Sequence, residues 1–251
     1  LEMGFQEEMS EVIVQIPYLK RRFLLSATDA PAIPRFVSEG DFLKLNFLED
    51  EEQIPERIKV YTVKSPEKDK LEVLSKLLCY LGDKSSLVFV NYRESVERVY
   101  RYLLQAGISC EMFHGGMEQK DRERALYKFS NGSCNVFVST DLAARGLDIP
   151  NIDHVIHYHL PLNEDAYIHR NGRTARWDAS GNVFLILGPE EYLPEFIQQI
   201  PEDYVWEGPK PDPAKPQWVT LYIGKGKKDK INKVDIVGFL SKVGGLGKSD
   251  I

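Results

Sequence analysis

Three arginines in the segment DAYIHRNGRTARWDASG (165–181) have the type and spacing for phosphate chemistry. Arg170, Arg173 and Arg176 recur at three-residue intervals, and His169 stands directly before the first of them. Residues three apart on a helix lie on neighbouring faces, so these cations repel one another unless an anion or an acid sits among them. A guanidinium meets phosphate oxygens in pairs and keeps its charge. The segment therefore predicts a phosphate site, with a solvated basic helix end as the alternative.

A second polar segment, STDLAARGLDIP (139–150), follows a short apolar run typical of a buried strand. Thr140 and the nearby amides could hold a phosphate oxygen, and Asp148 could accept hydrogen bonds from sugar hydroxyls. The alternative interpretation is an N-capped short helix that is closed by a turn at Gly146. The spacing within this segment alone favours neither the phosphate site nor the capped helix.

The elements that must position both segments alternate between strand and helix. Apolar periodicity predicts strands at 58–63, 86–91, 109–113, 134–139, 153–158, 182–187 and 203–206, and helices at 67–81, 93–106, 118–130, 164–171 and 190–199. This alternation predicts an α/β domain with a largely parallel sheet and right-handed crossovers. In such sheets the chemistry lies in loops beyond the carboxyl ends of the strands, which is where both polar segments fall.

Charge and proline content divide the chain of 251 residues. The net charge is −6, which excludes a uniformly basic nucleic-acid binder, but the last 43 residues carry nine Lys against four Asp, a net charge of +5. These 43 residues begin with a proline-rich stretch at 209–216, which predicts a stiff, extended linker. Near the other end, an acidic stretch containing Pro55 predicts a second linker at 49–56.

Composition also bears on compartment and metals. The three cysteines, Cys79, Cys110 and Cys134, are widely spaced and form no CxxC, so neither a disulfide framework nor a cysteine zinc site is expected. His157 and His159 share one strand face, but no third ligand has suitable spacing, and we predict no metal site. No apolar run approaches the roughly 20 residues that cross a bilayer, so we expect a soluble, cytoplasmic protein with no membrane partner.

Several motifs in the right order resemble those of DEAD-box RNA helicases. STDLAARGLDIP (139–150) and HRNGRTAR (169–176) resemble motifs V and VI of that family, and SLVFVN (86–91) with HGGMEQKDR (114–122) resembles motif IV and the QxxR element. Upstream, LLSAT (24–28) resembles the end of the first RecA-like domain, where SAT is motif III. The resemblance implies the end of a first RecA-like domain at 1–48 and a second, a RecA-like helicase C-terminal domain with a parallel sheet flanked by helices, at 57–208.

The resemblance also implies roles on the ATP side. In the family, the arginines that match Arg173 and Arg176 reach across the interdomain cleft to the γ-phosphate and stabilise charge during phosphoryl transfer. The residue that matches His169 links this cleft to the SAT motif. The positions of Asp148 and Gly146 correspond to a ribose contact and a close backbone approach, so the resemblance implies ATP and Mg²⁺ as cofactors.

On the RNA side, the family contacts mostly the sugar-phosphate backbone, which makes such a core indifferent to sequence. The matching positions here are Arg93, Gly116, Gln119, Arg122 and Thr140. Ser26 and Thr28 of the SAT motif would couple hydrolysis to RNA binding.

The sequence departs from the family pattern in three ways. Asn171 stands where the family usually has Ile, and Gly116 stands where an HGD sequence would have Asp. Neither a Walker A loop nor a DEAD-type acidic motif occurs, because GLGKS (245–249) has Lys242 where the spacing requires glycine. We therefore expect a piece of a longer protein that is inactive alone and lacks most of the ATP site, which the first domain would supply together with the Mg²⁺ ligands.

The basic tail, residues 217–251, resembles the start of the RRM-like domain of the DbpA subfamily, and TAR in motif VI is also like that subfamily. The segment TLYI predicts a strand and VDIVGFL predicts a helix, so a partial α+β unit is expected that meets RNA through the lysines of 224–233. Together these patterns predict an ATP-dependent helicase that remodels structured RNA, with ribosomal RNA as the expected partner. The alternatives are a non-catalytic RNA-binding module with the same fold and a DNA-directed relative.

Overall fold

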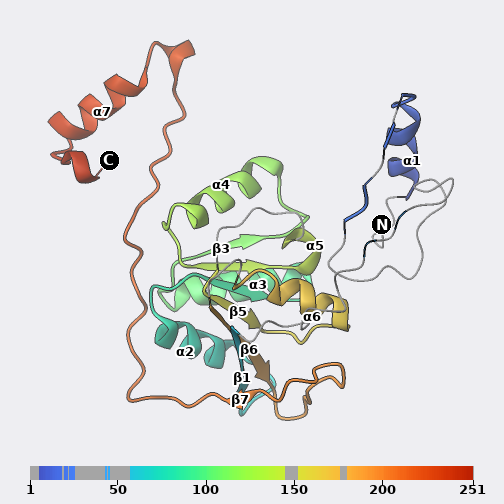
Figure 1. Ribbon diagram of the computed structural model, residues 1–251. Coiled ribbons are helices and arrows are strands. Elements are labelled where there is room, and N and C mark those ends of the chain that lie inside the picture. The colour runs from blue at the N-terminus through green and yellow to red at the C-terminus, as the bar shows by residue number, and fades with distance from the viewer. Residues whose placement is uncertain are drawn as a thin grey trace. The chain divides into compact units, whose positions relative to one another are not determined.

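The computed structural model describes residues 6–18, 20–21, 23–25, 43, 45, 57–144, 152–175 and 180–250. By its internal contacts the chain divides into two compact units, with the division between Pro216 and Gln217. In the first unit, Gln6–Val14 form α1, and the main sheet begins at Ile58 (Figure 1).

Seven strands of the described chain form one parallel sheet in the order β3-β4-β2-β5-β6-β1-β7 (Figure 1). The strands are β1 (Ile58–Lys64), β2 (Ser86–Phe89), β3 (Cys110–Phe113), β4 (Val136–Ser139), β5 (His154–His157), β6 (Gly181–Leu187) and β7 (Glu202–Asp203). The helices of this unit that follow α1 are α2 (Leu71–Leu81), α3 (Arg93–Gln105), α4 (Gln119–Ser130), α5 (Asp141–Ala144) and α6 (Glu164–Asn171). The predicted α/β class with a parallel sheet is confirmed.

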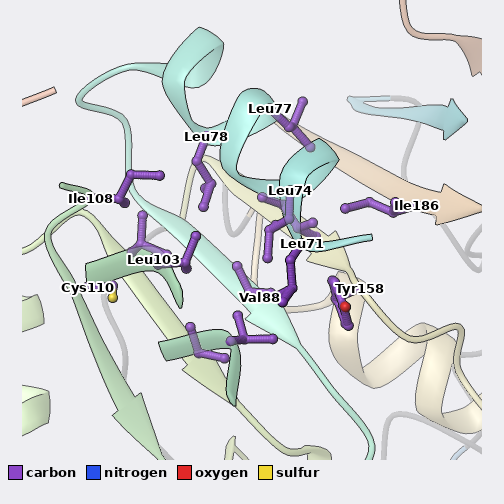
Figure 2. Close-up of a cluster of buried hydrophobic side chains, with 14 of the residues drawn as sticks. Leu71, Leu74, Leu77, Leu78, Val88, Leu103, Ile108, Cys110, Tyr158 and Ile186 are labelled. Atoms are coloured by element: carbon purple, nitrogen blue, oxygen red, sulfur yellow. The ribbon is translucent and has the colours of Figure 1, made fainter. Parts of the chain in front are cut away.

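The central strands are covered on both faces. All four residues of β2, β4 and β5 are buried, and successive side chains enter two different clusters. Leu87 joins the cluster that contains Phe129 of α4 and Tyr167 of α6. Val88 joins the cluster formed with α2 and α3, in which the α2 leucines gather over this strand (Figure 2). Helices therefore pack on opposite faces and leave the strand ends as the place for a site.

Helix α2 shows how apolar periodicity predicts a helix and where its predicted start differs from the structure. Its leucines recur at helical spacing and bury the side facing the sheet, which stabilises the fold by roughly 1.5–3 kcal/mol per side chain. The helix begins at Leu71 rather than at residue 67. Lys70 is its N-cap, with its carbonyl accepting from the Leu74 amide at 2.9 Å, and its buried Nζ donates to the carbonyl of Ile186 at 3.0 Å and to Glu191 at 2.7 Å. It ends at Gly82, whose φ of 69° lies in the left-handed region that glycine tolerates.

The predicted helix at 190–199 is wrong. The segment forms turns, with the amide of Ile197 donating to the carbonyl of Pro194 at 3.0 Å. Pro194 has no amide hydrogen and disfavours the helical conformation of the residue before it. The apolar residues that suggested a helix, Leu193, Phe196 and Ile197, instead pack on the α4/α6 face of the sheet.

The predicted strand at 203–206 is reduced to the two residues of β7. The amide of Tyr204 still donates to the carbonyl of Thr62. Beyond this bond, the Tyr204 and Trp206 rings pack in an aromatic cluster, with their centroids 5.1 Å apart. Lys76 of α2 lies 4.2 Å from the Trp206 ring, and the Tyr80 hydroxyl donates to the carbonyl of Gly208 at 2.7 Å. The proline-rich stretch that follows contains neither helix nor strand.

The second unit, residues 217–251, contains α7 (Lys233–Lys242) among its described residues. Asn232 caps this helix by accepting from the amides of Val234 and Asp235, and the Asp235 carboxylate accepts from the Asn232 amide in return. The helix predicted from VDIVGFL is thus confirmed. The strand predicted from TLYI is wrong for the described residues, because no neighbouring strand of this unit is present to pair with it.

Candidate functional site

Three polar residues occupy equivalent places at the carboxyl edge of the sheet. Asn91 lies two residues after β2, Asp141 two residues after β4 and His159 two residues after β5. Because β2 pairs with both β4 and β5 in register, these residues reach the same level of the sheet.

Arg170, near the end of α6, joins the three strand ends. It is 1% exposed, and its Nε and Nη2 donate to the two Asp141 carboxylate oxygens at 2.6 and 2.7 Å. Nη2 also donates to Asn91 Oδ1 at 2.8 Å, and Nη1 donates to the His159 carbonyl at 2.7 Å. The remaining Nη1 hydrogen is directed at His157 Nδ1, at 3.3 Å. All five guanidinium donors are therefore used inside the chain.

This network corrects one part of the sequence interpretation. Arg170 was grouped with Arg173 and Arg176 as a candidate phosphate ligand, but the anion beside it is Asp141 of the same chain. The bidentate pair fixes α6 to the first residue of α5, and Arg170 has no donor left for a ligand.

His157, the last residue of β5, and His159, two residues later, are neutral parts of the same network. Burial, with the Arg170 charge, lowers the pKa of His157 to about 3, and burial, with Lys70 nearby, lowers the pKa of His159 to about 4. His159 Nδ1 accepts from the amide of Asn91 at 3.1 Å, and His157 Nε2 meets Asn171 Oδ1 at 2.9 Å. Within the described ranges, no group of His, Cys, Asp or Glu is arranged to hold a metal ion.

A small pocket opens beside Arg170 at this edge. Its lining consists of Phe89, Asp141, Ala144, Ala166, His169, Arg170 and Arg173. The structure thus brings together two of the predicted catalytic residues, His169 and the partly buried Arg173. The other predicted residues of the ATP side, Arg176, Asp148 and Gly146, and the coupling residues Ser26 and Thr28, lie outside the described residues.

Helix α6 owes its direction to its first turn as well as to Arg170. Asn163 caps it, with its side-chain oxygen accepting from the Ala166 amide at 2.8 Å. Glu164 and Asp165 lie in the first turn and His169 and Arg170 in the last, which suits the helix dipole.

The predicted RNA residues lie at the ends of the three neighbouring strands β3, β4 and β2. Arg93 follows β2 and reaches Gly116 after β3, where an added Cβ would lie 3.7 Å from Arg93 Cδ and 3.2 Å from His114 Nδ1. A side chain at Gly116 would crowd the His114 ring, which would have to shift by a few tenths of an ångström, while its distance to Arg93 would be an ordinary contact. The Gly116 amide donates to His114 Nδ1 at 3.2 Å, which leaves the proton of the neutral ring on Nε2.

The remaining members of this predicted set differ in exposure, from the exposed Gln119 to the buried Thr140. The Arg122 guanidinium lies 4.8 Å from the Phe113 ring, and Gln119 donates to Glu123 on its own helix at 3.0 Å. Thr140 is buried at the end of β4. The structure therefore places Arg93 near Gly116, and the contacts of this predicted set with RNA stay a prediction.

Sequence reasoning gave no role to Asn91 and no partner to Asp141, although both complete the Arg170 network. A usable signal existed: each is a polar residue two positions beyond a fully buried strand. Lys70 was also missed, because a lysine in a charged turn gives no sign that it will be buried.

Comparisons with known proteins can now be set against this geometry. Residues 69–178 match the helicase conserved C-terminal domain, and residues 220–251 match the DbpA RNA binding domain. ATP-dependent RNA helicase DbpA of Escherichia coli (strain K12) is 32% identical over 259 residues, covering 100% of this chain and 56% of that protein. E. coli DEAD-box protein SrmB, in its crystal structure with regulator of ribonuclease activity A, is 32% identical with a TM-score of 0.54, covering 64% of this chain and 98% of that one. The chain belongs to the DEAD-box RNA helicase family.

The helicase match spans the Arg170 network and the pocket. A further DEAD-box structure, S. cerevisiae Dbp5 bound to RNA and ADP BeF3, has a TM-score of 0.64 at 27% identity, covering 75% of this chain and 50% of that one. Some relatives match this chain from end to end, and the chain spans about half the length of those proteins. Among its described residues, no helix is both long and apolar enough to cross a bilayer.

Proposed function

We propose that this chain is the part of an ATP-dependent RNA helicase that supplies arginine and RNA-backbone contacts, in an enzyme that remodels structured RNA, ribosomal RNA in particular. The observation that carries the proposal is the clamped end of α6. All five Arg170 donors bond groups of this chain. Arg173, three residues later, lines the pocket on the carboxyl edge together with His169.

The charge that Arg173 brings to the lining of this pocket suits the anionic end of a nucleotide. A partly buried guanidinium stabilises charge that develops on a phosphoryl group better than an exposed one, because less water screens it. Arg173 and Arg176 would face the terminal phosphate, while Asp148 and Gly146 would meet the ribose side. When bound, ATP with Mg²⁺ supplies the phosphoryl group that water accepts, and the Mg²⁺ ligands would come mainly from another domain.

The RNA contacts of this proposal lie at the ends of β2, β3 and β4. Arg93 lies near Gly116 there, and a cation next to a backbone without a side chain is suited to a phosphate. The basic second unit would add affinity for structured RNA, and the match of residues 220–251 to an RNA binding domain supports that role.

The test is RNA-dependent ATP hydrolysis by the full-length protein. We expect turnover that structured RNA stimulates and that DNA of the same sequence does not, and no turnover by this chain alone. Stimulation by DNA would instead indicate a DNA-directed relative. RNA binding by the full-length protein with no hydrolysis would indicate a non-catalytic module and would overturn the proposal.

A further inference from the structure

A buried polar pair lies beneath the end of α6. His157 of β5 is fully buried and Asn171, the last residue of α6, is 2% exposed. The His157 ring has Phe89 at 6.3 Å and Tyr167 at 5.6 Å as aromatic neighbours. An imidazole and an amide in such surroundings cost stability unless they bond each other, which they do at 2.9 Å.

The direction of these bonds follows from Arg170. A guanidinium only donates, so His157 Nδ1 must accept from Arg170 Nη1, and the ring proton must be on Nε2. Nε2 therefore donates to Asn171, which fixes the amide with its oxygen toward the ring. His157 of β5 thus bonds both Arg170 and Asn171, two consecutive residues at the end of α6.

The loop that carries Arg173 is tied to these two residues. The amide of Arg173 donates to the Arg170 carbonyl at 3.1 Å, and the amide of Thr174 donates to the Asn171 carbonyl at 3.0 Å. On the far side, Thr174 bridges to Ile152 and its hydroxyl donates to the Ile152 carbonyl. The Arg173 backbone is therefore held between the side-chain hydrogen bonds of Arg170 and Asn171 before it and the isolated Ile152–Thr174 bridge after it.

We propose that His157 and Asn171 are positioning residues for Arg173, with the His157–Asn171 hydrogen bond setting the direction in which the Arg173 guanidinium leaves the end of α6. This inference rests on the proposed ATPase function and deepens it. It also gives a role to Asn171, which stands where the resemblance led us to expect Ile, because an Ile there would leave His157 Nε2 without an acceptor.

The experiment compares N171A and H157N with wild type in the full-length protein. Both changes break the Nε2–Oδ1 bond, while the shorter Asn at 157 keeps an acceptor for Arg170. We expect kcat for RNA-stimulated ATP hydrolysis to fall about 10-fold or more, with KM for ATP within about two-fold, because misplaced groups act on the transition state. H157N serves as the second variant if N171A fails to fold.

A double-mutant cycle separates positioning from general destabilisation. If Asn171 acts through Arg173, R173A/N171A has the same kcat as R173A alone. The matched control is I156V, a change at the next position of β5, whose buried side chain enters the α2/α3 cluster on the opposite face. We expect I156V to lower thermal stability with kcat unchanged.

Each outcome decides the inference. Normal kcat in both N171A and H157N, or losses that multiply in R173A/N171A, overturn it while the proposed function stands. Absence of RNA-dependent hydrolysis in the wild-type protein overturns the proposed function and this inference with it.

Discussion

Two arginines of one motif have different environments. Arg170 is enclosed, with five donors bonded to Asp141, Asn91, His159 and His157. Arg173, three residues later, reaches the edge of the pocket. The fully paired charge of Arg170 joins α6 to the strand ends, and the proposed function assigns the ligand to Arg173, which lines the pocket.

Substitution of the Arg170 partner tests this division. D141N leaves a buried guanidinium without its counter-charge, so we expect the free energy of unfolding to fall by about 3–5 kcal/mol in urea denaturation. The matched control is D121N, because Asp121 pairs with Arg124 at 3.4 Å on the surface of α4. This control should change stability by less than about 0.5 kcal/mol. Equal effects of D141N and D121N would show that the Arg170 network is not a structural centre.

The buried histidines predict an acid-labile fold. The pKa values of about 3 for His157 and about 4 for His159 lie below that of a free histidine. Between pH 6.5 and these values the unfolded chain binds more protons than the folded one, so stability falls as the pH falls. Each histidine adds a slope of at most about 1.4 kcal/mol per pH unit.

Comparison of wild type with H159N isolates one of these contributions, because Asn retains an acceptor near the position of Nδ1. We expect unfolding free energies measured from pH 7 to pH 5 to decline less steeply in H159N. Identical slopes would contradict the neutral, buried assignment of His159.

At the scale of elements, α6 depends on both of its ends. N163A removes the acceptor for the Ala166 amide and should lower stability by about 1 kcal/mol, whereas N163D and N163S should stay close to wild type. Thermal unfolding of the three variants checks this. If N163S loses as much as N163A, the cap does not act through its side-chain oxygen.

The elements also show what sequence patterns can predict. Strands of the sheet were predictable because both faces are buried, which leaves continuous apolar runs such as 87–90. The segment 190–199 has apolar residues at near-helical spacing but folds as turns around Pro194, since packing against the sheet outweighs periodicity. The isolated TLYI segment could not form a strand without a partner in its unit.

The site was predictable to a similar degree. Motif spacing predicted that His169 and Arg173 belong to one site, and the pocket brings them together. The Arg170 network depends on strand order, since β2, β4 and β5 are neighbours in the sheet although far apart in sequence. No local pattern reveals that Asn91, Asp141 and His157 meet one guanidinium.

In the whole molecule, we expect the two units to have different roles. The second unit is rich in lysine and matches an RNA binding domain, while the first holds the pocket. Deletion of residues 217–251 from the full-length protein should weaken binding to a structured RNA more than binding to a plain duplex, as measured by fluorescence anisotropy at fixed salt. Equal losses on both RNAs would refute a specificity role for this unit.

The central claim is that guanidinium groups from this chain complete an ATP site whose other side belongs to another domain. The most direct measurement is RNA-stimulated ATP turnover by full-length R173A and R176A, with RNA affinity measured in parallel. We expect each variant to lose roughly 10³-fold or more in kcat and to keep RNA affinity within a few-fold of wild type. Turnover near the wild-type level in both variants would contradict it.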